Sequence, residues 1–91
     1  MNYSLIIPIY NEEKTLHELL FQLKKFSDIF EIIIINDGST DNSKKILSSQ
    51  KHIKVLHNPI NMGKGFSIIN AIEFVSHQNI ILMDGDLEID I

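Results

Sequence analysis

The sequence of 91 residues contains no cysteine and carries no excess of basic side chains. The absence of cysteine excludes a disulfide scaffold, cysteine-based zinc sites and cysteine nucleophiles. The formal net charge of −4 argues against a general surface for nucleic acid or for anionic membranes. A chain of this length forms at most one small domain, which buries roughly 60–65% of the surface that its unfolded form exposes.

Long apolar runs are also missing from the sequence. No apolar stretch approaches the roughly 18–20 residues that a membrane span needs, and no basic segment precedes the apolar run at the amino terminus. We therefore expect neither a signal peptide nor a membrane span within residues 1–91, and a cytoplasmic location.

Four short apolar runs, rich in isoleucine, alternate with longer stretches of mixed character. The runs cover residues 4–9, 31–35, 53–56 and 80–83. Continuous β-branched runs of this length indicate strands that are buried on both faces of a parallel sheet.

The stretches between the runs have helical spacing of their apolar residues. We expect helices over residues 15–26 and 41–49, and a third that carries Phe66, Ile69, Ile72 and Val75, with these stripes in the core. Asn11 or Thr15 is expected to cap the first of these helices. The resulting order, β-α-β-α-β-α-β, predicts an α/β fold with right-handed crossovers and a mostly parallel sheet.

Polar clusters follow all four predicted strands, at residues 10–13, 36–41, 57–65 and 84–90. Ligands of open parallel sheets bind at the carboxyl ends of the strands. The four clusters therefore predict one binding site at this edge. Because the last cluster directly precedes the end of the sequence, we expect residues 1–91 to be the first part of a longer domain.

Asp84 and Asp86 are the best candidates for a metal site. They send two carboxylates from one loop toward the same region, and Gly85 between them allows close approach of the backbone. Hard divalent cations bind carboxylates together with substrate phosphates. The alternative interpretation, a solvated acidic loop, is less favoured because the pair directly follows a predicted strand.

Two further clusters have both a structural and a functional interpretation. Asp37 precedes Gly38, so it belongs either to a turn with a cap for the next helix or to a site that binds a nucleobase or ribose, or to both. Lys64 lies between two glycines at the start of a predicted helix, where anions bind well, although neither common phosphate-loop pattern is present. The four histidines are scattered and are assigned no role.

Four segments together resemble the amino-terminal half of a family 2 glycosyltransferase domain of the GT-A fold. They are residues 5–13 (LIIPIYNEE), 34–41 (IINDGSTD), 61–65 (NMGKG) and 84–88 (DGDLE). The most similar branch is that of the polyprenyl- and dolichyl-phosphate mannosyl- and glucosyltransferases. The resemblance covers nearly the whole chain and is more specific for the family than for the substrate.

The resemblance implies a role for each matching position in binding a nucleotide-diphospho-sugar. Asp37 matches the acid that contacts the base or ribose, and Lys64 lies in a segment near the nucleotide. The pocket and metal positions are matched by Pro8, Tyr10, Glu12, Asp84, Gly85 and Asp86, of which Asp84 and Asp86 would hold the metal.

The family also implies a cofactor, partners and a location. The cofactor would be Mn²⁺ or Mg²⁺, the donor a UDP- or GDP-sugar, and the acceptor a lipid phosphate at the cytoplasmic face of a membrane. The general base is expected beyond Ile91, so the chain alone is expected to transfer no sugar.

Three alternatives remain open at this point. A pyrophosphorylase-like nucleotidyltransferase would need a basic glycine-rich loop after the first strand, where residues 11–14 are mainly acidic. A receiver-like signalling domain would need an acidic pair after the first strand and a phosphorylatable aspartate after the third. A non-catalytic nucleotide-binding module, or a degenerate fragment, lacks such a discriminating motif.

Overall fold

The computed structural model describes residues 3–83. The described part of the chain alternates strictly between strands and helices, as predicted. In chain order the elements are β1 (Tyr3–Ile9), α1 (Glu13–Lys24), β2 (Phe30–Asp37), α2 (Ser43–Leu47), β3 (Lys54–Asn58), α3 (Lys64–Ile72) and β4 (Asn79–Leu82). None of the helices within residues 3–83 is long and apolar enough to cross a membrane.

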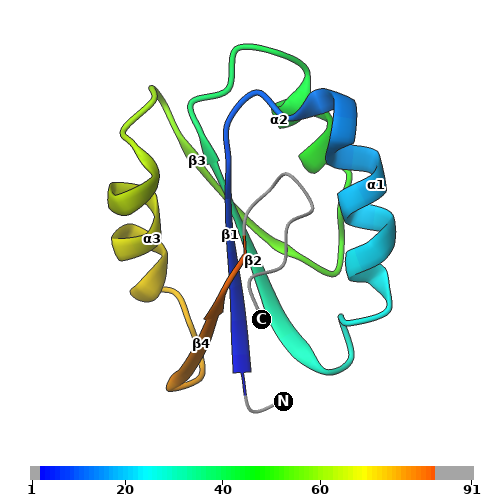
Figure 1. Cartoon of the computed structure of the whole chain (residues 1–91), viewed down its shortest axis with the longest axis vertical. Helices are drawn as coiled ribbons and strands as arrows, with labels where there is room; N and C mark the ends of the chain where they lie inside the picture. Colours follow the sequence, from blue (N-terminus) through cyan, green and yellow to red (C-terminus); the bar gives the residue numbers. More distant parts are fainter. Residues whose placement is uncertain (1–2, 84–91) are drawn as a thin grey trace.

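The strands of the described part form one sheet in the order β3-β2-β1-β4, and every pair is parallel. Figure 1 shows α1 and α2 on one face of the sheet and α3 on the other. The change of face follows from the strand order, because right-handed crossovers lead outward from β1 to β3 and then back past β1 to β4. The predicted α/β class and parallel pairing are thereby confirmed.

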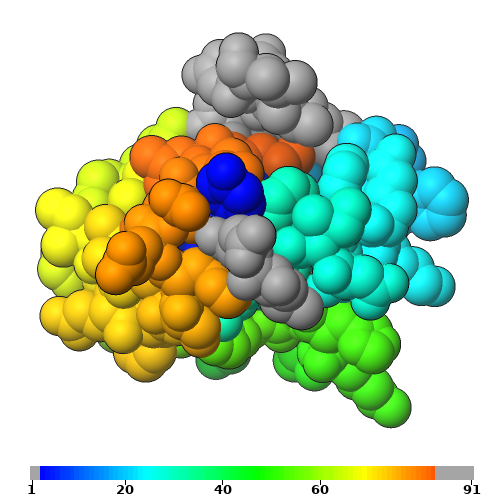
Figure 2. All heavy atoms as spheres, turned by 90° about the horizontal axis from the view of Figure 1, so that it is seen from below, coloured from blue at the N-terminus to red at the C-terminus, as the bar shows by residue number. Residues whose placement is uncertain are grey.

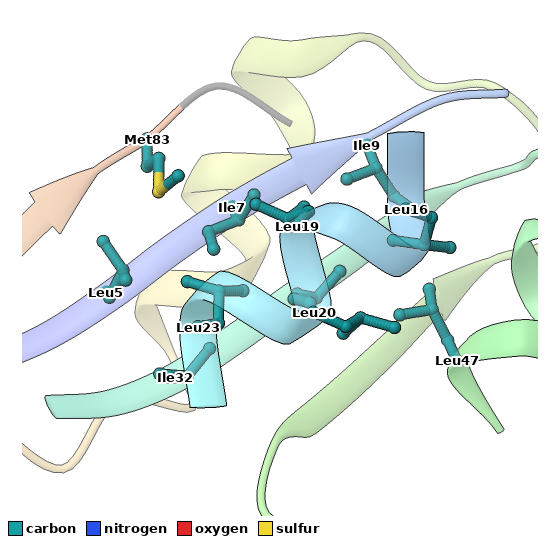
Figure 3. Close-up of a cluster of buried hydrophobic side chains, with 11 residues drawn as sticks. Leu5, Ile7, Ile9, Leu16, Leu19, Leu20, Leu23, Ile32, Leu47 and Met83 are labelled. Carbon is teal, nitrogen blue, oxygen red and sulfur yellow. The ribbon is translucent and has the colours of Figure 1, made fainter. Parts of the chain in front are cut away.

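The larger core lies between the sheet and α1. Side chains from alternate positions of β1 and β2 meet the leucines of α1, which recur at helical spacing (Figure 3). The buried members are Leu5, Ile7, Ile9, Leu16, Leu19, Leu20, Leu23, Ile32, Ile34, Leu47 and Met83. This face is the main source of hydrophobic stabilisation, at roughly 1.5–3 kcal/mol for each fully buried large side chain.

The core on the other face is smaller, and it corrects the prediction for the third helix. Ser67 and Ala71 of α3 are buried against the sheet, whereas Phe66 and Ile69 are 48% and 70% exposed and Ile72 is also exposed. Small residues let the helix approach β1 and β2 closely. The apolar residues of α3 include exposed as well as packed positions, so their spacing alone does not reveal which face packs on the sheet.

The prediction that all four strands are buried on both faces is wrong for the outer two. The isoleucines of β1 and β2 are buried on both faces, but β3 and β4 are edge strands whose residues are mostly half-buried or exposed. Within residues 3–83, each outer strand has a hydrogen-bonded neighbour on one side, which leaves part of its surface to solvent.

Glu31 links four segments at the amino end of the sheet, the edge that faces the viewer in Figure 2. Its carboxylate accepts hydrogen bonds from the Ser4 hydroxyl, the Ser76 backbone N–H, the Ser76 hydroxyl and the Lys54 Nζ, each at 2.8 Å. Burial raises the pKa of Glu31, but these hydrogen bonds outweigh burial and lower the pKa from 4.5 to about 2.

We expect Glu31→Gln to lower the free energy of unfolding by about 1–3 kcal/mol at neutral pH, because the amide cannot accept all four bonds. The ion pair with the exposed Lys54 contributes only a small part of this stabilisation, because solvent screens the attraction between the two charges. The folded-state pKa is depressed, so this stabilisation is complete above pH 4.5 and is lost as the pH falls through about 2. Urea unfolding of Glu31→Gln and of the unmodified chain at several pH values measures the difference in the free energy of unfolding. A difference that stays constant between pH 7 and pH 2.5 would contradict this assignment.

Candidate functional site at the carboxyl edge of the sheet

The loops after β1, β2 and β3 lie together at one edge of the sheet, at the top of Figure 1. The chain runs from β1 through β2 to β3 on one side and returns to β4 on the other side of β1. Open α/β sheets bind ligands at such a reversal of strand order, beyond the carboxyl ends of the strands. The predicted position of the site is thus the position that the topology favours.

Asn11 and Asp41 fasten the loop after β1 to the loop after β2. The Asn11 side-chain Oδ1 accepts hydrogen bonds from the backbone N–H groups of Thr40 at 2.8 Å and Asp41 at 3.3 Å. The Asn11 backbone N–H donates to the Ser39 hydroxyl at 3.0 Å. Asn11 has a φ of 51°, a left-handed conformation that asparagine tolerates better than most residues.

The helix starts differ from the predicted capping by Asn11 or Thr15. Helix α1 begins at Glu13, and neither the N-cap residue Glu12 nor any other N-cap in the described part makes a side-chain capping bond. Instead, the Glu13 N–H donates to Asp41 Oδ2 at 3.2 Å, from a loop 28 residues further along the chain. Asn11 bonds the neighbouring loop, so the two loops form one connected rim.

Asp37 ends β2 and lies beneath the loop that leads into α3. It is only 4% exposed. Its Oδ1 accepts from Asn58 Nδ2 at 2.9 Å and from the Met62 N–H at 2.7 Å, and its Oδ2 accepts from the Gly63 N–H at 3.0 Å. Burial raises the pKa of Asp37, but these hydrogen bonds outweigh it, so the pKa lies below its ordinary value and the group is ionised at neutral pH.

Gly38, next to Asp37, also brings the loop after β2 against the loop after β3. Its φ is +69°, and a Cβ at this position would overlap the peptide between Ile60 and Asn61. The loop after β2 therefore packs directly on the backbone of the loop after β3, which only a residue without a side chain allows.

Asn36, His57 and Asn58 belong to the polar clusters predicted at this edge, but the sequence interpretation gave none of them a role of its own. Asn36 Oδ1 accepts from the Ser39 N–H at 3.1 Å, so its amide faces His57 Nδ1, also at 3.1 Å. This arrangement suits a neutral imidazole, and burial together with the nearby charge of Lys44 lowers the pKa of His57. The available signal was a side-chain amide at the end of an apolar strand, as with Asn58 at the end of β3.

The remaining predicted site residues have different degrees of exposure. Pro8 is buried within β1, and Tyr10 just beyond the strand is 45% exposed. Glu12 is half-buried and accepts from the Thr15 hydroxyl at 3.3 Å. Lys64 is exposed as the first residue of α3. The structure thus brings Tyr10, Glu12, Asp37 and Lys64 to the same edge, with Pro8 beneath it.

The predicted metal ligands Asp84 and Asp86, together with Gly85, lie outside the described residues. Within residues 3–83 no group of three or more histidine, cysteine, aspartate or glutamate side chains could hold a metal ion. Strand β4 ends at Leu82, and the Met83 N–H donates to the Ile6 carbonyl of β1 at 3.1 Å. The chain therefore reaches the acidic segment from a position beside β1.

A hollow of about 280 Å³ lies elsewhere, between the end of α1 and the segment before β3. Its lining includes Leu23, Lys24 and His52, and it contains none of the predicted site residues. A ligand that approaches the carboxyl edge would not enter this hollow.

A parallel sheet with helices on both faces and polar loops at its carboxyl edge defines an open α/β domain, the type that binds ligands beyond the carboxyl ends of its strands. The chain belongs to glycosyl transferase family 2, whose model matches residues 4–91. Its fold is accordingly that of the amino-terminal part of the GT-A glycosyltransferases, as the resemblance predicted.

Three known proteins illustrate the relationship. Dolichyl-phosphate beta-glucosyltransferase ALG5A of Trichomonas vaginalis is 33% identical over 96 residues, covering 91% of this chain and 30% of the relative. The crystal structure of S. aureus TarS 1-349 in complex with UDP matches with a TM-score of 0.82 at 30% identity, over 94% of this chain and 28% of the solved TarS 1-349 chain.

The third is the mannosyltransferase PcManGT from Pyrobaculum calidifontis, solved in complex with GDP-Man and Mn²⁺. It matches with a TM-score of 0.78 over 93% of this chain and 27% of its own, at 18% identity, which shows the fold alone. The chain thus spans under a third of the length of each of these three proteins.

Proposed function

We propose that this chain binds the nucleotide-diphospho-sugar donor of a glycosyltransferase, at the carboxyl edge of its sheet, together with a divalent cation. The observation that carries the proposal is the convergence of the loops after β1, β2 and β3 at the reversal of strand order, in a chain that belongs to glycosyl transferase family 2. UDP in the related TarS structure supports a nucleotide ligand.

Three described residues offer a nucleotide-diphospho-sugar an aromatic ring, a carboxylate and a cation. Tyr10 exposes an aromatic ring with a hydroxyl, which suits contact with a planar base. Asp37 is a buried, ionised carboxylate bonded to the Met62 and Gly63 N–H groups, so it would act on a base or ribose through the loop that it holds in place. Lys64 at the start of α3 places a cation at a helix amino terminus, where a diphosphate is favoured.

Asp84 and Asp86 are the residues that would hold the cation. Carboxylate oxygens are the ligands that Mg²⁺ and Mn²⁺ prefer, and such ions are bound by one or two carboxylates plus substrate phosphates. When bound, the ion supplies charge neutralisation for the diphosphate. The protein's own contribution at this edge is to hold the donor in place and to orient it.

The proposed acceptor is supported by the names of the relatives rather than by residues in this part of the chain. ALG5A is named for dolichyl phosphate, and other matching proteins are named for undecaprenyl phosphate. We therefore propose a lipid phosphate as the acceptor class of the whole protein. The transfer would take place at the cytoplasmic face of a membrane.

Mn²⁺ allows the site to be mapped directly, because the ion is paramagnetic and broadens nearby amide signals. On addition of UDP or GDP with Mn²⁺, we expect broadening of amides in residues 10–12, 38–40 and 62–64, while those of Glu31 and Ser76 at the opposite edge stay sharp. The same titration with Mg²⁺ is the diamagnetic control. Broadening centred on the Glu31 edge, or none in the presence of either nucleotide, would overturn the proposed site.

A further inference from the structure

Asn58 is the least exposed polar residue of β3, at 8%, and the sequence interpretation gave it no role of its own within the cluster of residues 57–65. Its Nδ2 donates to Asp37 Oδ1 and to the Ser67 hydroxyl, each at 2.9 Å. Both bonds are buried. One amide therefore joins the end of β2, the end of β3 and the first turns of α3.

The contacts of Asp37 extend this connection into the loop before α3. Two bonds reach Oδ1, from Asn58 and from the Met62 N–H, while the Gly63 N–H reaches Oδ2. A carboxylate offers about four lone-pair positions, and the Ser67 hydroxyl also stabilises its charge. The orientation of the carboxylate and the course of residues 62–63 are thus set by the same bonds.

We infer that Asn58 is a positioning residue for nucleotide binding, acting through Asp37 and through the loop that leads to Lys64. The inference rests on the proposed function, because it gives Asn58 a task only if a nucleotide binds at this edge. Without Asn58, Asp37 loses a buried donor and Ser67 loses its tie to β3. The carboxylate then rotates and the loop moves, so the ligand meets a site that is no longer held in one arrangement.

A residue that matters only for folding would behave differently. Its removal would lower the melting temperature, but the protein that remains folded would bind the nucleotide as before. Glu31 provides the matched control. It is a similarly buried polar side chain with several hydrogen bonds, but it lies at the opposite edge of the sheet.

The experiment is calorimetry with UDP and with GDP, each with Mn²⁺, at a temperature well below the melting temperature of every variant. We expect Asn58→Ala to weaken binding about tenfold, Asn58→Ser to restore part of the loss, and Glu31→Gln to leave the affinity unchanged. In an Asp37→Ala background, Asn58→Ala should have little further effect, because both changes disable one unit.

Amide exchange supplies a readout that needs no ligand. We expect Asn58→Ala to speed exchange of the Met62 and Gly63 amides at least tenfold, and Glu31→Gln to leave them unchanged. An unaltered affinity of Asn58→Ala, or effects that add to those of Asp37→Ala, would overturn the inference. Should the unmodified chain bind neither UDP nor GDP, the proposed function fails, and unchanged exchange at Met62 and Gly63 would then refute the positioning role as well.

Discussion

Replacement of Gly38 by alanine is expected to lower the free energy of unfolding by about 2–4 kcal/mol, a large effect for one methyl group. Two causes add. The φ of +69° is unfavourable for any residue with a Cβ, at roughly 1–2 kcal/mol. In addition, the methyl group would overlap the peptide between Ile60 and Asn61, so the loop after β3 must move.

Gly63 separates these two causes. Its φ of +94° is also positive, but a Cβ there would meet no atom within 4 Å. Gly63→Ala should therefore carry the conformational penalty alone, and its effect should be smaller than that of Gly38→Ala. Urea unfolding of the two variants beside the unmodified chain measures the difference. Equal destabilisation by both substitutions would show that the contact between the two loops contributes nothing.

The second large effect is expected at Asp86, in the binding of the nucleotide with metal. If Asp86 holds the cation, Asp86→Asn should remove most of the affinity that Mn²⁺ adds and leave metal-free binding nearly unchanged. Loss of an interaction with a charged group costs about 1.5–3 kcal/mol, or roughly a tenfold to hundredfold loss of affinity.

Asp28→Asn is the matched control for Asp86→Asn. It makes the same change of charge at an exposed position in the turn between α1 and β2, so it should leave the metal effect intact. The measurement is calorimetry with UDP and GDP in the presence and absence of Mn²⁺. Full retention of the Mn²⁺ enhancement in Asp86→Asn would return the acidic segment to its alternative interpretation as a solvated loop.

The fold could be predicted from the sequence because its strongest signals are local. The isoleucines of residues 32–35 form a run too continuous for a half-exposed strand, and the leucines of α1 recur at helical spacing. Local patterns cannot show which strand lies at an edge, and this is why β3 and β4 were expected to be buried. They also cannot choose between the two apolar faces of α3, where the small residues Ser67 and Ala71 pack inward.

The location of the polar clusters could be predicted from the sequence, but the hydrogen bonds between them could not. Four polar clusters after four strands indicated the carboxyl edge, and the structure brings the described ones together there. The contacts that shape the edge join residues far apart in the chain, such as Asp37 with Gly63 and Asn11 with Thr40. Such pairs leave no periodic signal. For this reason Asn58 was given no role of its own, although it lies in the predicted cluster of residues 57–65.

Binding of the donor nucleotide by the unmodified chain tests the central claim most directly. Calorimetric titration with UDP and with GDP, each with and without Mn²⁺, is the measurement, and ATP serves as a nucleotide of another class. We expect UDP or GDP to bind more tightly than ATP, and Mn²⁺ to raise the affinity. Absence of binding by both UDP and GDP in the presence of Mn²⁺, for a chain shown to be folded, would contradict it.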